Sequence, residues 1–230
     1  MSNIFKAIDE NDIESICKIL KSNPEATIDK GDKRGYFPLH YVAQYNSNTE
    51  VVKLILNAYP EAAAEEDNNY MFPLHHAARY NSNVEVVKLI LEAYPQAATK
   101  KNNNREFPLH HATQYNSNME VVKLILNACS RAAAKEDNDG MFPLHHIIRN
   151  NSNIEVVKLI FDAYPEAAYK MDYTGWFPLH HAAKYNSNID VVKLILDAHP
   201  QAISEKDKYS DDFPLHYAAR YNSNVEVVKL

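Results

Sequence analysis

Hydrophobic positions recur along the chain in two kinds of segment that alternate. In VEVVKLILEAY, residues 84–94, apolar side chains stand at the first, fourth, seventh and eighth positions, and a neighbouring stripe is apolar too. This spacing predicts a helix that is buried on most sides. The shorter segment before it, PLHHAARY at 73–80, opens with proline, which suits the first position of a helix. The pattern therefore predicts a helix of about two turns followed by a longer one.

Both predicted helices end at residues that stop a helix. The short one ends at Tyr-Asn-Ser-Asn, where we expect an asparagine in the left-handed conformation to close it. The long one ends at Tyr-Pro, because proline cannot continue a helix. A polar stretch such as EAAAEEDNNYM, residues 61–71, follows, and we expect a loop there.

This unit of two helices repeats along the chain. Its Phe-Pro start recurs at spacings of 35, 35, 35, 35 and 36 residues, at Phe37, Phe72, Phe107, Phe142, Phe177 and Phe213. Helices this short are unstable alone, so the copies must stack on one another to bury their apolar faces. We predict a divergent N-terminal capping repeat over 1–36 and an incomplete final repeat over 213–230. Between them, 37–212 divides into five full repeats, 37–71, 72–106, 107–141, 142–176 and 177–212.

The Pro-Leu-His sequence at each start resembles the ankyrin repeat, whose signature reads T-P-L-H-x-A. A preceding Asp-x-x-Gly is complete at Asp32/Gly35, Asp137/Gly140 and Asp172/Gly175. Its glycine is replaced at Tyr70, Arg105 and Ser210. The 34-residue tetratricopeptide repeat is the alternative of similar period, but its Trp and Leu-Gly positions are absent here.

The resemblance implies an all-α fold: an ankyrin-type helix-turn-helix repeat solenoid with short finger loops. In such arrays the first helices and the fingers line a concave face. One departure is that phenylalanine stands in every copy where the family has threonine. A lost helix cap costs about 0.5–2 kcal/mol, and we expect the phenylalanine ring to offset this loss by packing between repeats.

Composition narrows the classes of function. The net charge of -6 disfavours nucleic-acid binding, and only four glycines argue against glycine-rich phosphate loops. The N-terminus lacks the basic start and apolar run of a signal peptide, and no apolar stretch approaches the ~20 residues that span a bilayer. We therefore expect an intracellular, cytoplasmic protein without membrane insertion, the nucleus being the alternative compartment.

Adjacent histidines are the obvious candidates for metal chemistry. They occur in four pairs, His75–His76, His110–His111, His145–His146 and His180–His181. Neighbouring residues on a helix point about 100° apart, and stacked helices lie ~8–10 Å apart, so we expect no metal site. The resemblance implies that the first histidine of a pair bonds loop backbone, and we expect the second to pack near the groove. Neither Cys17 nor Cys129 has a distinctive histidine partner, so we predict no catalytic residue, no cofactor and no small-molecule substrate.

Candidate partner-binding residues follow from the concave face that the resemblance implies. The last turn of each first helix carries a basic or amide side chain followed in most copies by tyrosine, and the fingers vary between copies. Tyrosine and arginine are common in binding hot spots, and arginine holds carboxylates well. The candidates are Arg79, Tyr80, Gln114, Tyr115, Arg149, Lys184, Tyr185, Arg220 and Tyr221 on the helices, and Met71, Met141, Tyr173 and Trp176 on the fingers.

We therefore expect a non-catalytic protein–protein interaction scaffold that presents a concave groove and variable fingers to a protein partner with an acidic surface. One alternative is the ankyrin segment of a larger signalling, channel or ubiquitin-ligase adaptor protein. A remote alternative is single-stranded nucleic-acid binding, which interleaved cations and tyrosines favour and the acidic net charge opposes. The candidate stripe also has a purely structural interpretation, in which its tyrosines pack along the stack.

Overall fold

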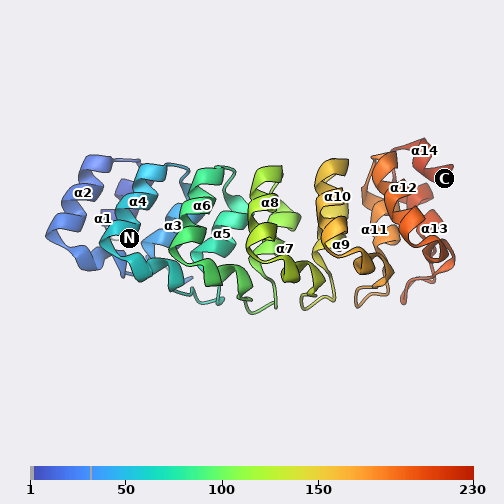
Figure 1. Ribbon diagram of the computed structural model, residues 1–230, viewed down its shortest axis with the longest axis horizontal. Helices are drawn as coiled ribbons and strands as arrows, with labels where there is room; N and C mark the ends of the chain where they lie inside the picture. Colours follow the sequence, from blue (N-terminus) through green and yellow to red (C-terminus); the bar gives the residue numbers. More distant parts are fainter. Residues whose placement is uncertain (1–2, 32) are drawn as a thin grey trace. The chain divides into compact units, whose positions relative to one another are not determined.

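The structure is a computed structural model that describes residues 3–31 and 33–230 (Figure 1). Asp32, in the first Asp-x-x-Gly motif, lies outside the described residues. Within those residues the chain forms α-helices and short 3-10 helices and no strand. Its contacts divide it into two compact units, unit 1 (Met1–Cys129) and unit 2 (Ser130–Leu230).

Unit 1 is a stack of helix pairs, each followed by a turn of 3-10 helix. The first pair is α1 and α2, and the pairs α3/α4, α5/α6 and α7/α8 follow. Their bounds are α1 (Asn3–Asp9), α2 (Ile13–Ser22), α3 (Pro38–Tyr45), α4 (Thr49–Ala58), α5 (Pro73–Tyr80), α6 (Val84–Ala93), α7 (Pro108–Tyr115) and α8 (Met119–Ala128), with 3-10 helices at Pro24–Thr27, Pro60–Ala64 and Pro95–Thr99.

Unit 2 continues the same pattern. Its bounds are α9 (Pro143–Asn150), α10 (Ile154–Ala163), α11 (Pro178–Tyr185), α12 (Ile189–Ala198), α13 (Pro214–Tyr221) and α14 (Val225–Val228), with 3-10 helices at Ser130–Ala134, Pro165–Tyr169 and Pro200–Ser204. Each Tyr-Pro or equivalent ends a long helix as expected, but the chain then makes a 3-10 turn whose alanines are buried, rather than entering a loop directly.

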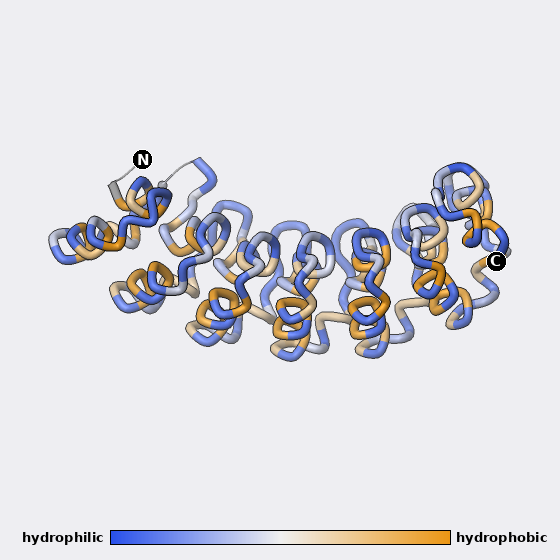
Figure 2. Tube along the Cα trace, turned by 90° about the horizontal axis from the view of Figure 1, so that it is seen from above, coloured by the Kyte–Doolittle hydropathy of each residue, from blue (hydrophilic) through white to orange (hydrophobic). Residues whose placement is uncertain are grey.

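Equivalent helices pack side by side within each unit. In unit 1, α3 packs on α5 and α5 on α7; in unit 2, α9 packs on α11 and α11 on α13. The second helices bury their apolar stripe, as Val86, Val87 and Ile90 of α6 show with at most 1% exposure. Figure 2 shows the helices of each unit in two rows, with hydrophobic residues concentrated in the helical segments and hydrophilic residues in the connections. The predicted all-α, helix-turn-helix repeat fold is confirmed.

The first helices from α3 to α13 are capped by a histidine side chain and not by the phenylalanine that stands in place of threonine. The backbone N–H of Phe72 donates to Nδ1 of His75, three residues later, at 3.0 Å, and the same bond joins Phe142 to His145 at 3.1 Å. The phenylalanine side chain offers no acceptor, so only this half of a capping box forms. The buried Phe72 ring lies 5.8 Å from the ring of Tyr94 in its own repeat, while the Phe37 ring lies 5.1 Å from Nζ of Lys30 in the preceding repeat.

The turn between the two helices differs from the prediction. Asn81 follows α5 with φ -96° and ψ 118°, an extended conformation, and not the left-handed one. Its side chain Nδ2 donates to the carbonyls of Ala43 and Asn46 in the preceding repeat, at 3.3 and 3.1 Å. Asn83 accepts from the N–H of Glu85 and so caps the N-terminus of α6.

The same bonds recur at Asn116 in unit 1 and at Asn186 and Asn222 in unit 2. We call this set of inter-repeat bonds the asparagine ladder. The Asn-Ser-Asn turn therefore joins repeats through its side chains.

The fingers form a second ladder, made of backbone bonds. The N–H of Asn68 donates to the carbonyl of Arg34 at 3.0 Å in unit 1, and the N–H of Tyr173 donates to the carbonyl of Asp139 at 2.9 Å in unit 2. One residue of each finger takes a positive φ, which is 75° at Gly140 and 57° at Tyr70. In the last finger this conformation falls on Asp211, and not on Ser210, which we had matched to the glycine.

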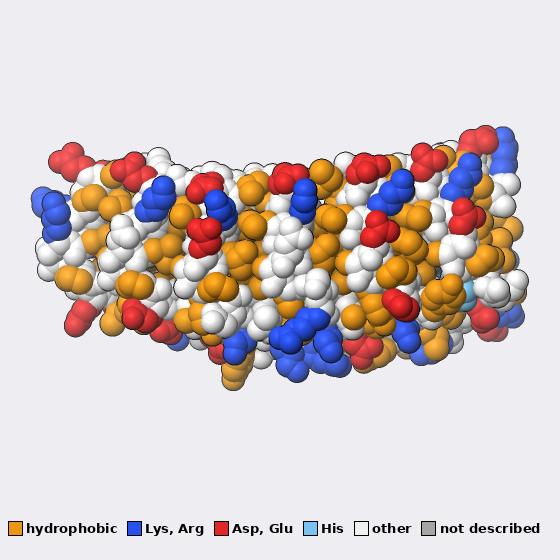
Figure 3. Space-filling model, in the orientation of Figure 1, with side chains coloured by type: hydrophobic (Ala, Val, Ile, Leu, Met, Phe, Trp, Pro, Cys, Tyr) orange, Lys and Arg blue, Asp and Glu red, His pale blue; other side chains and the backbone are white. Residues whose placement is uncertain are grey.

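The second helices turn charged side chains outward. In the view of Figure 3, basic and acidic side chains stand in rows over these helices in each unit. Lys88 of α6, for example, lies 4.0 Å from Glu92 one turn later, and both are largely exposed. None of the helices in the described part of the chain is long and apolar enough to cross a membrane.

Candidate functional site

A groove in unit 2 brings together most of the candidates predicted there. We call it the unit 2 groove; its volume is about 470 Å³, and α9, α11, α13 and the fingers between them form its walls. It is lined by Asp139, Met141, Arg149, Asp172, Tyr173, Thr174, Trp176, His181, Lys184, Tyr185, Asp207, Tyr209, Ser210 and Tyr217. Five of these side chains are aromatic rings of Tyr or Trp, so the lining combines stacking surfaces with two cations.

The ammonium of Lys184 lies among four aromatic rings. Its Nζ is 4.7 Å from the centroid of Tyr221, 4.9 Å from Tyr185, 5.0 Å from Trp176 and 5.5 Å from Tyr217. We call these four rings the aromatic cage. Each contact is within the ~6 Å over which a ring face attracts a cation. The rings also contact each other, Trp176 and Tyr217 at 4.4 Å between centroids.

Arg149, like Lys184, stacks on a tyrosine ring of the following repeat. Its guanidinium Cζ lies 4.8 Å from the Tyr185 ring, which belongs to the next repeat, just as Tyr221 follows Lys184 by one repeat. Among the described residues, neither cation forms an ion pair with a carboxylate. Arg220 differs, because it lies 3.0 Å from Asp212 of its own finger and is therefore neutralised.

Unit 1 carries the equivalent arrangement. The guanidinium of Arg79 lies 4.9 Å from the Tyr80 ring and 3.8 Å from the Tyr115 ring of the next repeat. Both tyrosines are 46% exposed. The Nε atom of Arg79 and the Oε1 atom of Gln114 are buried without a hydrogen-bond partner among the described residues.

The finger candidates divide into exposed and buried residues. Tyr173 is 51% exposed, and its hydroxyl donates to Glu136 at 3.2 Å. Trp176 is half-buried in the aromatic cage. Met71 and Met141, however, are only 7% and 6% exposed. Their backbone N–H groups bond to the finger aspartates Asp67 and Asp137, and Met141 still lines the unit 2 groove.

The histidine after Pro-Leu bonds the next loop at His40 and at His145, as the resemblance implied for the first histidine of a pair, whereas Nε2 of His75 and of His180 is buried without a hydrogen-bond partner in the described part of the chain. His40 Nε2 lies 3.0 Å from the carbonyl of Met71 in unit 1, and His145 Nε2 lies 3.0 Å from that of Lys170 in unit 2. Because Nδ1 of His145 accepts the Phe142 N–H, Nε2 must be the protonated nitrogen that donates. Burial, followed by repulsion from His181, lowers the pKa of His145 to about 3, and it is neutral at physiological pH.

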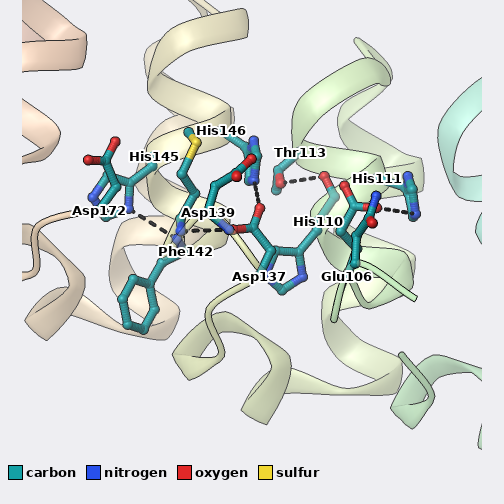
Figure 4. Close-up of polar contacts among 12 residues, drawn as sticks. Glu106, His110, His111, Thr113, Asp137, Asp139, Phe142, His145, His146 and Asp172 are labelled. Carbon is teal, nitrogen blue, oxygen red and sulfur yellow. Dashed lines mark hydrogen bonds and ion pairs between the residues drawn. The ribbon is translucent and has the colours of Figure 1, made fainter. Parts of the chain in front are cut away.

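The second histidine of three of the four pairs bonds an aspartate, whereas Nε2 of His111 lies 3.3 Å from Nδ2 of Asn102. Nε2 of His146 lies 2.8 Å from Asp137, and Figure 4 shows the two side chains facing each other. His181 pairs likewise with Asp172 at 2.9 Å, and His76 with Asp67 at 2.9 Å. We call these the buried aspartate–histidine pairs. Sequence reasoning missed them, although an aspartate nine residues before the second histidine was a visible signal.

The aspartate of each pair also organises its finger. Oδ1 of Asp172 accepts the backbone N–H groups of Thr174 and Trp176 at 2.9 and 3.0 Å. Burial alone raises the pKa of the Asp172 carboxyl, but hydrogen bonds from His181 and Thr174 outweigh burial and hold the pKa at about 2. The pair therefore fixes the finger that carries Trp176 against the helix that carries Lys184.

The remaining chemistry in the described part of the chain offers little to a metal ion or a substrate. No group of three or more His, Cys, Asp or Glu side chains there could hold a metal ion. Cys129 is buried at the end of α8, and Cys17 lies half-buried in the first repeat. His145, His146 and His181 use ring nitrogens on backbone groups or aspartate, which suits a structural role.

Comparison with known proteins agrees with the fold. The sequence profile of the family "Ankyrin repeats (3 copies)" matches residues 4–99, 94–172 and 153–230. A search of curated proteins found no significant match. Among solved structures, the human ASB11 ankyrin repeat domain is similar with a TM-score of 0.80 at 16% identity, covering 100% of this chain and 97% of that one. At this identity the likeness shows the fold alone. Ankyrin repeats are generally protein-interaction modules and typically non-catalytic. Since the profile matches cover almost the whole sequence, the chain belongs to the ankyrin-repeat family.

Proposed function

We propose that this protein is a scaffold that binds another protein through the cations and tyrosines at the ends of its first helices, and that it performs no chemistry of its own. The observation that carries the proposal is the set of cations stacked on tyrosine rings without carboxylate partners. We call this set the aromatic–basic stripe; it consists of Arg79, Tyr80, Gln114 and Tyr115 in unit 1 and Arg149, Lys184, Tyr185 and Tyr221 in unit 2.

The stripe has the physical properties of a recognition surface. Its tyrosines are between 40% and 53% exposed, so each presents apolar area and a hydroxyl to a partner. Stacking holds the basic side chains in place before binding, which reduces the conformational entropy lost on association. Tyrosine and arginine are also the residue types that dominate binding hot spots.

Charge favours a partner with an acidic surface. The cations of the stripe stand on the first helices, whereas many acidic side chains stand on the second helices and loops, such as Glu85 and Glu92 on α6. Complementary charge increases the association rate and suppresses wrong partners. Arg220, which Asp212 already neutralises, is left out of this proposal.

A pull-down from cell lysate tests the proposal. The intact protein is compared with a variant carrying Arg79→Glu, Arg149→Glu and Lys184→Glu. The control carries Lys53→Glu, Lys123→Glu and Lys193→Glu, which makes the same charge change on exposed positions of the second helices. We expect a protein that binds the intact chain and the control and is lost from the stripe variant, with all three chains equally helical by circular dichroism. Equal binding by all three would refute the stripe.

A further inference from the structure

The two cations of the unit 2 groove are held close together by one ring. Arg149 Cζ and Lys184 Nζ lie 4.8 and 4.9 Å from the centroid of the Tyr185 ring, so the two charges are less than 10 Å apart. Among the described residues neither is paired with a carboxylate. Two unpaired cations at this separation attract an anion more strongly than either alone, because their potentials add.

The aromatic cage makes Lys184 a fixed charge rather than a mobile one. A surface lysine normally samples many rotamers, and ordering it on binding costs conformational entropy. Four rings within 5.5 Å of its Nζ order the side chain in advance. Ring faces attract the ammonium but provide no full negative charge, so the capacity of the ammonium for an ion pair with an incoming anion remains.

The shape of the groove fits side chains of an extended segment. A volume of about 470 Å³ lies within the range of sites that bind small ligands. Trp176 and Tyr217 give it aromatic walls, and Tyr173 and Tyr209 stand at its rim with 51% and 80% exposure. These rings suit an apolar or aromatic side chain next to the anion.

Three aspartates, Asp139, Asp172 and Asp207, line the groove beside the two cations. Asp172 and Asp207 are buried beneath it, at 5% and 3% exposure, and use their oxygens on finger N–H groups and on His181 and Tyr217. The repulsion from these carboxylates and the attraction from the two cations both scale with the charge of the anion, so a comparison of glutamate and phosphoserine peptides decides between a carboxylate and a phosphate ligand.

Building on the proposed function, we propose that the unit 2 groove binds a short, extended acidic peptide, with a carboxylate held by Lys184 and Arg149 and a neighbouring apolar side chain against Trp176. The partner is thus recognised through a linear segment rich in Asp or Glu, and not through the surface of a folded domain.

Trp176 supplies the assay, because it is the only tryptophan of the chain and lies in the groove. Its fluorescence is followed in the full protein during titration with an acetylated peptide, Glu-Glu-Phe-Glu-Glu. Two further peptides complete the set, one with glutamine and one with phosphoserine in place of every glutamate. Each titration is repeated with Lys184→Met and with the control Lys193→Met, which removes the same charge from the exposed face of α12.

We expect the glutamate peptide to bind, the glutamine peptide to bind at least about tenfold more weakly, and Lys184→Met to lower the affinity for the glutamate peptide about tenfold while Lys193→Met does not. Equal affinity of the glutamate and glutamine peptides, or equal effects of the two lysine variants, would overturn the proposal. Tighter binding of the phosphoserine peptide than of the glutamate peptide would overturn the choice of a carboxylate and identify a phosphate as the preferred ligand.

The two proposals fail in different ways. If none of the peptides changes the fluorescence of Trp176, the acidic-peptide proposal is wrong. A lysate partner that depends on the aromatic–basic stripe would then still support the proposed function, with a folded surface as the ligand. If the peptides bind, and a lysate partner binds the intact chain and the stripe variant equally, the groove is real and the wider stripe is refuted.

Discussion

Replacing Asn186 tests whether the asparagine ladder, in addition to apolar packing, holds neighbouring repeats together. Asn186 is 2% exposed, and its Nδ2 donates to the carbonyls of Ile148 and Asn151 at 2.7 and 3.0 Å. Its Oδ1 accepts the N–H of Asn188 at 3.0 Å. Asn186→Ala removes three hydrogen bonds and leaves their partners unsatisfied. At about 0.5–1.5 kcal/mol each, we expect the free energy of unfolding to fall by about 2–4 kcal/mol.

The assay is urea unfolding followed by the fluorescence of Trp176, which reports on unit 2. Ser187→Ala is the matched control, because Ser187 lies in the same turn with an exposed side chain and should change stability by less than about 0.5 kcal/mol. Asn186→Asp keeps the size of the side chain but directs a carboxylate at two carbonyls. It should therefore be less stable than Asn186→Ala at neutral pH.

If Asn186→Ala and Ser187→Ala unfold at the same urea concentration, the asparagine ladder does not stabilise the stack. In that case the ladder would be a consequence of stacking and not a cause of its stability. The same conclusion follows if Asn186→Asp is as stable as the unsubstituted protein, because a buried carboxylate cannot donate hydrogen bonds to the carbonyls that the amide satisfies.

Three further predictions concern the fingers and the buried histidines. Tyr70→Gly should stabilise the protein by a few tenths to about 1 kcal/mol, because Tyr70 holds φ at 57°; an unchanged melting temperature would argue against strain there. Gly140→Ala should destabilise it by more than about 2 kcal/mol, since an added Cβ would lie 2.5 Å from the ring of Tyr173 and 2.9 Å from its backbone N; calorimetry checks this. Stability should fall as pH drops from about 7 to about 5. The pKa of His145 is lowered from 6.5 to about 3, so the unfolded chain binds the proton first as the pH falls. The free energy of unfolding should therefore drop by about 2 kcal/mol for each such histidine by about pH 5. The pKa of Asp172 is lowered to about 2, so this carboxyl adds a further loss of stability only below pH 3.8. Urea midpoints that do not change with pH would contradict the burial of these histidines in neutral form.

The helices could be predicted from the sequence because their signals are local. Proline at the start of the first helix, the apolar stripe of the second and the proline after it all act within one repeat. The family resemblance supplied the loop-binding role of the first histidine, which His145 confirms through its bond to Lys170. The stacking of repeats followed from the shortness of the helices.

Features that depend on the neighbouring repeat were predicted less well. We expected a left-handed asparagine to close the short helix, but Asn81 is extended. Its side chain bonds Ala43 and Asn46, which lie a whole repeat earlier in the chain, so no local pattern indicated this conformation. The burial of Met141, a finger candidate, was not foreseen either, because it goes with the bond from its N–H to the finger aspartate. The partner-binding role of the stripe stays a prediction, since exposure and charge alone do not identify a ligand.

The repeat 177–212 is one residue longer than the others, and the extra residue lies in its finger. The finger closes with the N–H of Asp207 donating to the carbonyl of Asp212, five residues later, whereas the preceding one closes from Asp172 to Trp176, four residues later. Beyond it, Asn222 still donates to Ala183 and Asn186 as the ladder requires. The finger tip can therefore change length while the stack keeps its register. Protein engineers could graft a foreign loop there, and duplicated or lengthened copies could arise in evolution without any change to the interfaces between repeats.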